Sequence, residues 1–387
     1  MIKRIRFNDV LVTAKLELVN NILFIQDSSP CIRTIKIASA LKSKGLNILL
    51  AHLNKTPDEA YGYGNSSFTS LTKLPKYDLK KIKLIKEIII NNNISILHYH
   101  NEPDVLCAKL IKSDLNIPII YDQHDFSSIK KNISYKHLIY ERICNENNDG
   151  AVYITENYRK LVSQKYKINP NNIVFPNYGL DYLLIDKEDI LPKLSDADKK
   201  IHLVYVGLIT EHKYKVRNML NIFERLSKTG FVIHIYPTRN KEYKQYRKIE
   251  NVIIHKQLPI QRLLKDISQY NFGIAFLNNK ISDIKKINEI KYGFWNKMYD
   301  YLMAGIPVLT SDFYVDMSNF IKTNGFGVSV ESIENITPNL LKKFPIEKFD
   351  ENIVYKREKY TMENQIDRLI SFYHQTIKCF KEKDAKA

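Results

Sequence analysis

The chain of 387 residues contains only four cysteines, Cys31, Cys107, Cys144 and Cys379, which lie far apart in the sequence. Their spacing matches no zinc-ligand pattern, so the sequence argues against a zinc site. Such sparse cysteine usage is typical of a protein in the reducing cytoplasm. No stretch approaches the roughly 18 uninterrupted apolar residues of a membrane span. We also find no low-complexity segment and no repeat of solenoid period.

Residues 1–6 are basic, but no long apolar region or small-residue cleavage site follows them, so we expect no secretion signal. The chain carries 59 Lys and Arg against 42 Asp and Glu, a formal charge of +17. Attraction to an anionic membrane surface or to a phosphorylated ligand is one explanation. Compositional drift is the other, because the lysines are scattered. No nucleic-acid-binding module is recognisable, and we expect no nucleic-acid partner.

Apolar runs of strand length alternate with helical stretches, which predicts α/β layers around parallel sheets. The expected strands of the first half are residues 22–25, 47–52, 94–99, 118–121, 151–155 and 173–175. Helices are expected between them, over residues 32–44, 79–91, 105–113, 135–145 and 157–165. After residue 180 the alternation restarts, with strands expected at residues 202–206, 232–236, 252–255, 272–276, 308–310 and 328–330.

The charged stretch 181–200 carries little strand signal and contains Pro192, so we interpret it as a connection between domains. The sequence thus predicts two Rossmann-like domains, residues 1–180 and residues 181–360, that face one cleft at the carboxyl ends of their strands. A final helix, about residues 362–380, lies in a third segment, residues 361–387.

The most informative stretch is Asn296-Lys297-Met298-Tyr299-Asp300-Tyr301-Leu302-Met303-Ala304-Gly305-Ile306-Pro307-Val308. It predicts a short helix with Asn296 as N-cap and Gly305 just after its end, followed by a buried strand. Lys297 and Asp300 share one helix face. A lysine beside a helix N-terminus suits a diphosphate, and a carboxylate one turn on suits the two hydroxyls of a ribose. An ordinary amphipathic helix is the alternative.

This stretch resembles the nucleotide-sugar site of GT-B glycosyltransferases, particularly the family 4-like group, whose pattern is N-K-x-[YF]-[ED]-Y-x-x-[AS]-G-x-P-V. Weaker similarity covers most of the remaining chain, at His98-Tyr99-His100, Tyr121-Asp122-Gln123-His124-Asp125, Phe175-Pro176-Asn177-Tyr178-Gly179 and Leu203-Val204-Tyr205-Val206-Gly207. The resemblance implies a GT-B fold in which residues 1–180 bind the acceptor and residues 181–360 bind the nucleotide-sugar donor, and in which the final helix returns to the first domain. It also implies no cofactor and no metal, because helix dipoles and basic groups stabilise the diphosphate.

In this family a basic residue after the glycine turn, here Gly207, meets the donor phosphates. Lys213, Lys215 and Arg217 are candidates, and a helix beginning near Val216 would add its N-terminal amides. Spacing does not choose among the three, and we favour Arg217 for its forked guanidinium. A solvated charge run is the alternative.

By the same resemblance, Arg239 and Leu258 flank the nucleobase. The alternative for Arg239 is that it is an ordinary charged residue of a loop. Many retaining members also carry a glutamate eight positions before the acid represented here by Asp300. This chain has Tyr292 there, and Glu289 is out of register, so the stereochemistry stays open.

His124 and Asp125 are our candidate catalytic residues, because a parallel strand would deliver them to the cleft. A histidine of near-neutral pKa can act as a general base, and a carboxylate can bind or activate an acceptor hydroxyl. His98 and His100 are rival candidates, and a purely structural role is the alternative for each. These histidines and carboxylates do not have the sequence spacing of a standard metal-ligand motif.

We therefore expect a cytoplasmic, metal-independent transferase of hexosyl type. It would move sugar from a UDP-sugar to a hydroxyl of a glycan or lipid-linked glycan acceptor, in surface polysaccharide or glycoconjugate synthesis. A nucleotide-sugar 2-epimerase, or a non-catalytic membrane-surface partner with a decayed fold, are the alternatives. The helix over residues 79–91 has apolar positions 79, 82, 85, 88 and 89 with lysines between them. It suits an anionic lipid surface, or it is a layer helix with a wet basic face.

Overall fold

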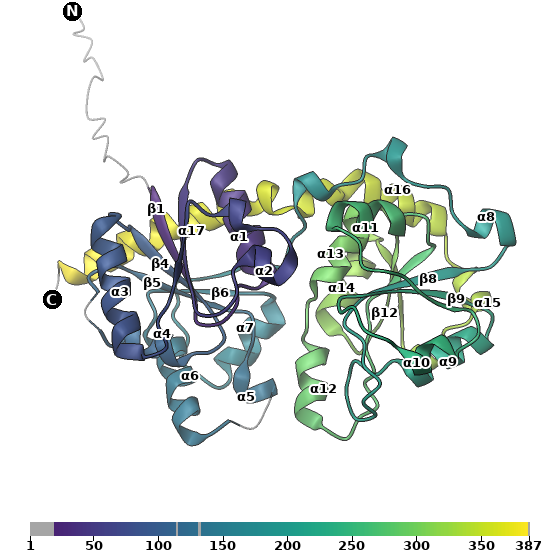
Figure 1. Cartoon of the computed structure of the whole chain (residues 1–387), viewed down its shortest axis with the longest axis horizontal. Helices are drawn as coiled ribbons and strands as arrows, with labels where there is room; N and C mark the ends of the chain where they lie inside the picture. The colour runs from purple at the N-terminus through teal and green to yellow at the C-terminus, as the bar shows by residue number, and fades with distance from the viewer. Residues whose placement is uncertain (1–18, 114, 131–132, 386–387) are drawn as a thin grey trace, which may run out of the picture.

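The computed structural model describes residues 19–113, 115–130 and 133–385, and its core consists of two parallel β-sheets (Figure 1). The first sheet has seven strands in the order β3-β2-β1-β4-β5-β6-β7. The second has six, in the order β10-β9-β8-β11-β12-β13. The expected α/β architecture with two parallel sheets is confirmed. Residues 1–6, where we looked for a secretion signal, lie outside the described residues.

The strands of the first sheet are β1 Asn21–Gln26, β2 Asn47–His52, β3 Ser70–Lys73, β4 Ile96–His100, β5 Ile119–Gln123, β6 Gly150–Tyr153 and β7 Asn172–Val174. Those of the second are β8 His202–Gly207, β9 Val232–Pro237, β10 Val252–Ile254, β11 Phe272–Ile274, β12 Val308–Ser311 and β13 Gly327–Val330. Parallel sheets are covered on both faces, so their strands are continuous apolar runs that a sequence displays clearly. The edge strand β3 was not predicted, because its four residues contain only one large apolar side chain.

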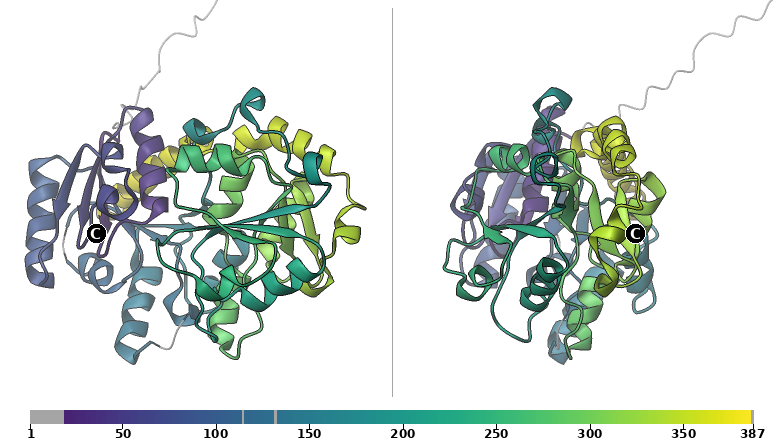
Figure 2. Two further views of the ribbon diagram at one scale, coloured as in Figure 1. Left: turned by 45° about the vertical axis from the view of Figure 1, so that its right-hand side comes forward. Right: turned by 90° about the vertical axis from the view of Figure 1, so that its right-hand side faces the viewer.

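Helices lie on both faces of the second sheet (Figure 2). The helices of the first half are α1 Ile32–Ser43, α2 Pro57–Tyr61, α3 Asp78–Asn91, α4 Val105–Ile111, α5 Ser127–Lys130, α6 Tyr135–Asn147 and α7 Glu156–Ser163. Those of the second half are α8 Ser195–Asp198, α9 Leu220–Lys228, α10 Lys244–Arg247, α11 Ile260–Ile267, α12 Ile284–Lys291, α13 Asn296–Met303, α14 Val315–Asn324, α15 Pro338–Leu341, α16 Ile346–Lys356 and α17 Met362–Asp384. None of these described helices is long and apolar enough to cross a membrane.

Helix α17 follows the second sheet in sequence but packs against the first (Figure 1). It contacts α1 and β7, and the Tyr373 hydroxyl lies 2.6 Å from Nδ1 of His98 in β4. The chain returns where Gly179 and Thr361 form an isolated parallel bridge. The first sheet ends at Val174 and the second begins at His202, so the expected division at residue 180 falls within the connection.

Helix α3 differs from the expected layer helix in two respects. Leu79, assigned to its apolar face, is 84% exposed. Lys81, assigned to a wet basic face, is buried and donates to Asp27 at 2.7 Å. The assignment of both residues was wrong. Because Lys81 pairs with the buried Asp27 carboxylate, which follows β1, the helix presents Lys81 to the interior and Leu79 to solvent.

Candidate active site

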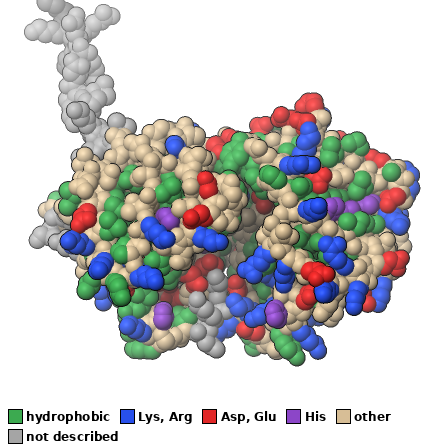
Figure 3. Space-filling view, in the orientation of Figure 1, with side chains coloured by type: hydrophobic (Ala, Val, Ile, Leu, Met, Phe, Trp, Pro, Cys, Tyr) green, Lys and Arg blue, Asp and Glu red, His purple; other side chains and the backbone are tan. Residues whose placement is uncertain are grey.

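A cleft of about 1000 Å³ lies between the two sheets, at the carboxyl ends of their strands. Figure 3 shows the hollow, with Lys and Arg side chains along its rim. Most of the sequence-predicted site residues line it, namely His124, Asp125, Gly207, Arg217, Arg239, Lys297 and Asp300. Lys215 and Leu258 are not among the lining residues. Lys215 is exposed, and Ile260 and Leu263 line the cleft in the region expected for Leu258.

Helix α13 carries the two residues predicted to hold the nucleotide. Gly305 follows its end with φ +75°, the left-handed conformation that glycine adopts without strain, as expected. The N-cap is Trp295 and not Asn296, so that prediction was wrong by one residue. The Asn296 side chain is instead used across the cleft, where its Oδ1 accepts a hydrogen bond of 3.2 Å from Nζ of Lys36.

The Nζ atom of Lys297, a residue that is itself partly exposed, is buried and has no hydrogen-bond partner among the described residues. Its Nζ lies 3.9 Å from the centroid of the Tyr205 ring and 5.3 Å from that of Trp295. Burial, and secondly the charge of Arg217, lower the pKa of Lys297 well below its ordinary value. A cation in this position lacks the counter-charge that an anion in the cleft would provide.

Asp300 lies one turn beyond Lys297 and faces a lysine of the first half of the chain. Nζ of Lys36, on α1, is 3.8 Å from Oδ1 of Asp300. Burial raises the pKa of Asp300 against the opposing effect of Lys36. Burial likewise lowers the pKa of Lys36, although Asp300 favours its charged form. Sequence reasoning missed Lys36, because it lies in no motif and its partner is 264 positions away.

The loop after β8 is longer than expected. Helix α9 begins at Leu220, so the prediction of a helix near Val216 was wrong, and Arg217 lies in the preceding loop. The loop is held by a backbone bond from Thr210 to the Arg217 carbonyl oxygen at 3.1 Å. The N-terminal amides of α9 therefore begin three residues after Arg217 and not beside it, as had been expected for the phosphate site.

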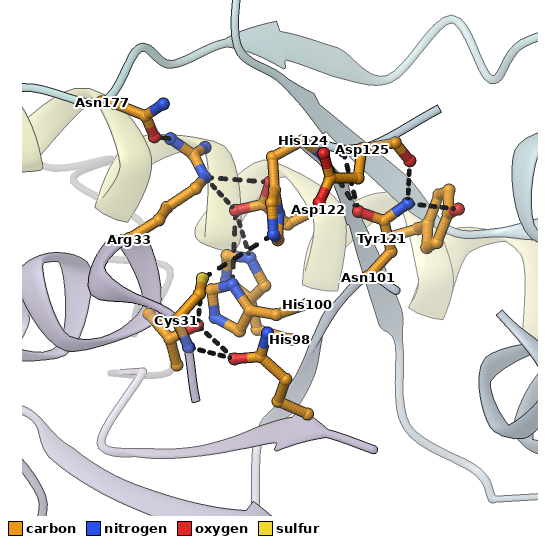
Figure 4. A network of polar contacts seen from close by, with 12 residues as sticks. Cys31, Arg33, His98, His100, Asn101, Tyr121, Asp122, His124, Asp125 and Asn177 are labelled. Carbon is orange, nitrogen blue, oxygen red and sulfur yellow. Dashed lines mark hydrogen bonds and ion pairs between the residues drawn. The ribbon is translucent and has the colours of Figure 1, made fainter. Parts of the chain in front are cut away.

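Behind the cleft, a buried carboxylate collects four nitrogen groups (Figure 4). Asp122 accepts from Nε of Arg33 at 2.8 and 3.1 Å and lies 3.3 Å from Nε2 of His98. Nδ1 of His100 is at 3.6 Å and Nδ1 of His124 at 3.5 Å. Burial opposes ionisation, but Arg33 first and then the histidines hold the pKa of Asp122 well below its usual range.

Of the three histidines in this cluster, only His124 lines the cleft. His98 and His100 are fully buried and stack in parallel with centroids 4.4 Å apart, so neither rival candidate reaches the cavity. The donor atoms of His98, His100 and Asp122 lie within 4.8 Å of one another, a grouping that can hold a metal ion. Because Arg33 already bonds both oxygens of Asp122, a second cation is disfavoured there.

His124 is not the near-neutral base that we expected. Burial acts against its protonation, but the neighbouring Cys31 and Asp122 raise the pKa of His124 to about 10. An imidazolium donates protons and does not accept them. A role as general base is therefore not supported by this geometry, and Asp125, which also lines the cleft, is the remaining predicted acceptor of a proton.

Asn177 links this cluster to the nucleotide helix. Its Oδ1 accepts from Nη1 of Arg33 at 3.1 Å, and its Nδ2 donates at 2.9 Å to the carbonyl oxygen of Phe294, two residues before α13. On another side, Thr155 donates to Asp316 of α14 at 2.8 Å. These bonds join the first half of the chain to the second around the cleft, so we expect the residues on the two walls of the cleft to move together.

Comparison with known proteins agrees with this arrangement. Residues 21–155 match the family model described as glycosyl transferase 4-like, and residues 209–356 match that of the glucosyltransferase 3-like C-terminal domain. No curated protein matches the chain.

Solved structures with the same fold cover nearly the whole chain. A glycosyltransferase from Rickettsia africae ESF-5 is 13% identical with a TM-score of 0.65, covering 93% of this chain and 99% of its own. Sucrose-phosphate synthase from Thermosynechococcus elongatus is 13% identical with a TM-score of 0.64, covering 95% and 100%. HepE from Anabaena, in complex with UDP-glucose, is 11% identical with a TM-score of 0.63, covering 91% and 99%.

These findings define a GT-B fold, with two Rossmann-like sheets facing one cleft. The first part of the chain matches a glycosyl transferase 4-like model and the second a glucosyltransferase 3-like one, so the family matches and the fold together support a transferase.

Proposed function

We propose that the protein transfers a sugar, of hexosyl type, from a UDP-sugar to a hydroxyl acceptor. The observation that carries this proposal is the buried Lys297 ammonium, which faces the cleft without a partner among the described side chains. A diphosphate supplies the missing charge. The UDP-glucose complex of Anabaena HepE, which shares the fold, supports a uridine nucleotide as the donor.

On the donor side, Lys297 and Arg217 bind the diphosphate beside the glycine turn at Gly207, and Asp300 accepts from the ribose hydroxyls. Negative charge grows on the diphosphate as the glycosidic bond breaks, so fixed cations in a water-poor cleft lower the barrier. Arg239, two residues after the end of β9, binds the nucleobase. Glu289 lines the cleft on α12 and is available to the donor sugar, despite its shifted register.

On the acceptor side, the Asp125 carboxylate receives the proton of the attacking hydroxyl. The His124 imidazolium lies beside Asp122 and lines the cleft, where its positive charge attracts the oxygen of the acceptor hydroxyl. The protein itself would hold no cofactor.

For the pathway we propose surface polysaccharide or glycoconjugate synthesis at the cytoplasmic face of a membrane. Helix α3 supports this placement, because Leu79 and Ile90 are 84% and 73% exposed and share one face with Lys83 and Lys86. Such a face suits anionic lipid. Co-sedimentation with vesicles tests it: binding should require anionic lipid and weaken with salt. Equal binding to neutral vesicles, or no binding, would leave compositional drift as the explanation of the charge.

The donor assignment is tested with Asp300→Asn, which keeps the side-chain shape but removes the charge that faces Lys36. Each charge-assisted hydrogen bond is worth about 1.5–3 kcal/mol, so UDP affinity should fall at least about tenfold by calorimetry. Asp367→Asn is the matched control, because this exposed residue lies on α17 away from the cleft. Unchanged UDP affinity in Asp300→Asn would contradict the assignment.

The function as a whole is tested by a screen of nucleotide sugars. A donor at 100 times its dissociation constant should stabilise the protein by about 2.7 kcal/mol. An absence of protection by any nucleotide favours the non-catalytic alternative. Conversion of donor alone to its 2-epimer, with no free nucleotide, favours the epimerase, whereas release of UDP with a hydroxyl acceptor supports transfer.

A further inference from the structure

Cys31 adjoins the lining of the cleft without belonging to it, and the proposed transfer reaction gives it no role. It is partly exposed and forms the N-cap of α1. Its Sγ lies 3.7 Å from Nε2 of His124, and Nδ1 of His124 lies 3.5 Å from Oδ1 of Asp122 (Figure 4). Both His124 and Ile32, the next residue after Cys31, line the cleft.

This order of groups is the arrangement of an activated thiol: nucleophile, imidazole and an orienting carboxylate. The surroundings fix it in place. The Cys31 amide donates to Oε1 of Gln26 at 2.9 Å, and Arg33 holds the Asp122 carboxylate from the other side at 2.8 Å. The first turn of α1, a helix of 12 residues, adds free backbone amides that favour a negative sulfur.

The charge state agrees with the geometry. Burial opposes ionisation of the Cys31 thiol, but the His124 imidazolium outweighs it, and the pKa of Cys31 falls to about 7. The other three cysteines lack this environment. Cys107 and Cys144 are buried, and burial raises the pKa of Cys144, whereas Cys379 is partly exposed on α17, away from the cleft.

We propose that Cys31, His124 and Asp122 form a reactive-thiol site that is converted to a mixed disulfide by a small anionic disulfide molecule. The neighbouring cleft favours an anion, because its described lining has five basic side chains, Lys36, Lys55, Arg217, Arg239 and Lys297, against three acidic ones, Asp125, Glu289 and Asp300. The Cys31 thiolate attacks one sulfur of the reagent. The S–S bond of the reagent breaks as a new S–S bond to Cys31 forms. The second sulfur of the reagent leaves as a thiolate, which takes a proton from water.

The test is the rate of mixed-disulfide formation at each cysteine of the full chain, followed by peptide mass spectrometry from pH 5.5 to 9. Oxidised glutathione is the anionic probe and cystamine the cationic one. At pH 7 we expect Cys31 to react with oxidised glutathione at least tenfold faster than Cys379, with a half-maximal rate near pH 7. The ratio should be smaller with cystamine, and a reductant should reverse the modification.

His124→Gln should slow Cys31 at pH 7 at least tenfold and move its pH profile upward, while Cys379 reacts as before. Cys31→Ser identifies the modified peptide. Equal rates at Cys31 and Cys379 in the parent protein would overturn the proposal without any variant. If the rate of mixed-disulfide formation at Cys31 had the same pH dependence in a folded His124→Gln protein as in the parent, the role of the imidazolium would be overturned. A preference for cystamine would overturn the anionic choice. None of these measurements depends on sugar transfer.

Discussion

Replacing Lys297 by Met should make the ligand-free protein more stable and its nucleotide binding weaker. The Lys297 ammonium is buried and repelled by Arg217, and within the described part of the chain it makes no hydrogen bond. Methionine is one atom shorter but keeps most of the packing against Tyr205, whose ring centroid lies 3.9 Å from the ammonium. The substitution therefore removes the cost of burying a charge and leaves the surroundings filled.

The magnitude follows from two opposing contributions. An ion taken out of water costs several kcal/mol even after relaxation. A desolvated cation–π contact with Tyr205 returns about 2 kcal/mol of this. We therefore expect a net gain of about 1–2 kcal/mol, or about 2–8 °C in melting temperature for a domain of this size. In the nucleotide complex, loss of one or two charge-assisted bonds of about 1.5–3 kcal/mol should weaken UDP binding tenfold or more.

Thermal unfolding with and without UDP, together with calorimetric titration, measures both effects on the same samples. Lys228→Met is the control, because this lysine is 73% exposed and pairs with Glu224 on the same helix. It should change neither quantity measurably. A Lys297→Met protein that melts below the parent while binding UDP equally well would refute the reasoning, since the ammonium would then stabilise the fold and not the ligand.

Three further outcomes are expected. Arg33→Met should destabilise the protein by about 3–5 kcal/mol in urea, because it leaves the Asp122 carboxylate buried and unbalanced, and adding Asp122→Asn should recover much of the loss. Burial raises the pKa of Asp104 from 3.8 to about 7, so its contribution to stability is present below about pH 4 and is lost as the pH rises to about 7. Asp104→Asn keeps an acceptor for the Tyr121 hydroxyl but has no carboxyl group to ionise, so it does not lose stability as the pH rises. Its free energy of unfolding in urea, relative to that of the parent protein, should therefore increase by about 2–4 kcal/mol between about pH 4 and pH 7. If the basic residues alone stabilise the diphosphate, transfer should proceed unchanged in a chelator, and a rate that stops there and returns with Mg²⁺ or Mn²⁺ would contradict this.

The order and type of the main elements could be predicted from the sequence because the determinants are local. A strand buried on both faces needs an unbroken apolar run, and β1, β2 and β8 each display one. The end of α13 was equally local, since the left-handed turn at Gly305 depends on the residue itself. Where the local signal was weak, prediction failed, as for the polar edge strand β3.

The candidate site divides in the same way. Lys297 and Asp300 were found because one helical turn brings them together regardless of the rest of the molecule. The residues of the first half that contact this region were not found. Lys36 reaches Asn296 and Asp300, and Asn177 reaches the Phe294 carbonyl oxygen, only when the two halves of the chain close on each other.

Charge states depended on tertiary structure most of all. The sequence placed His124 at the end of a strand, where parallel strands deliver side chains to a cleft. Only the folded protein set the Cys31 sulfur on one side of its ring and the Asp122 carboxylate on the other. The same holds for Lys81, whose buried partner Asp27 lies 54 positions earlier. Backbone pattern is a property of neighbouring residues, whereas burial and ionic pairing are properties of groups that meet only after folding.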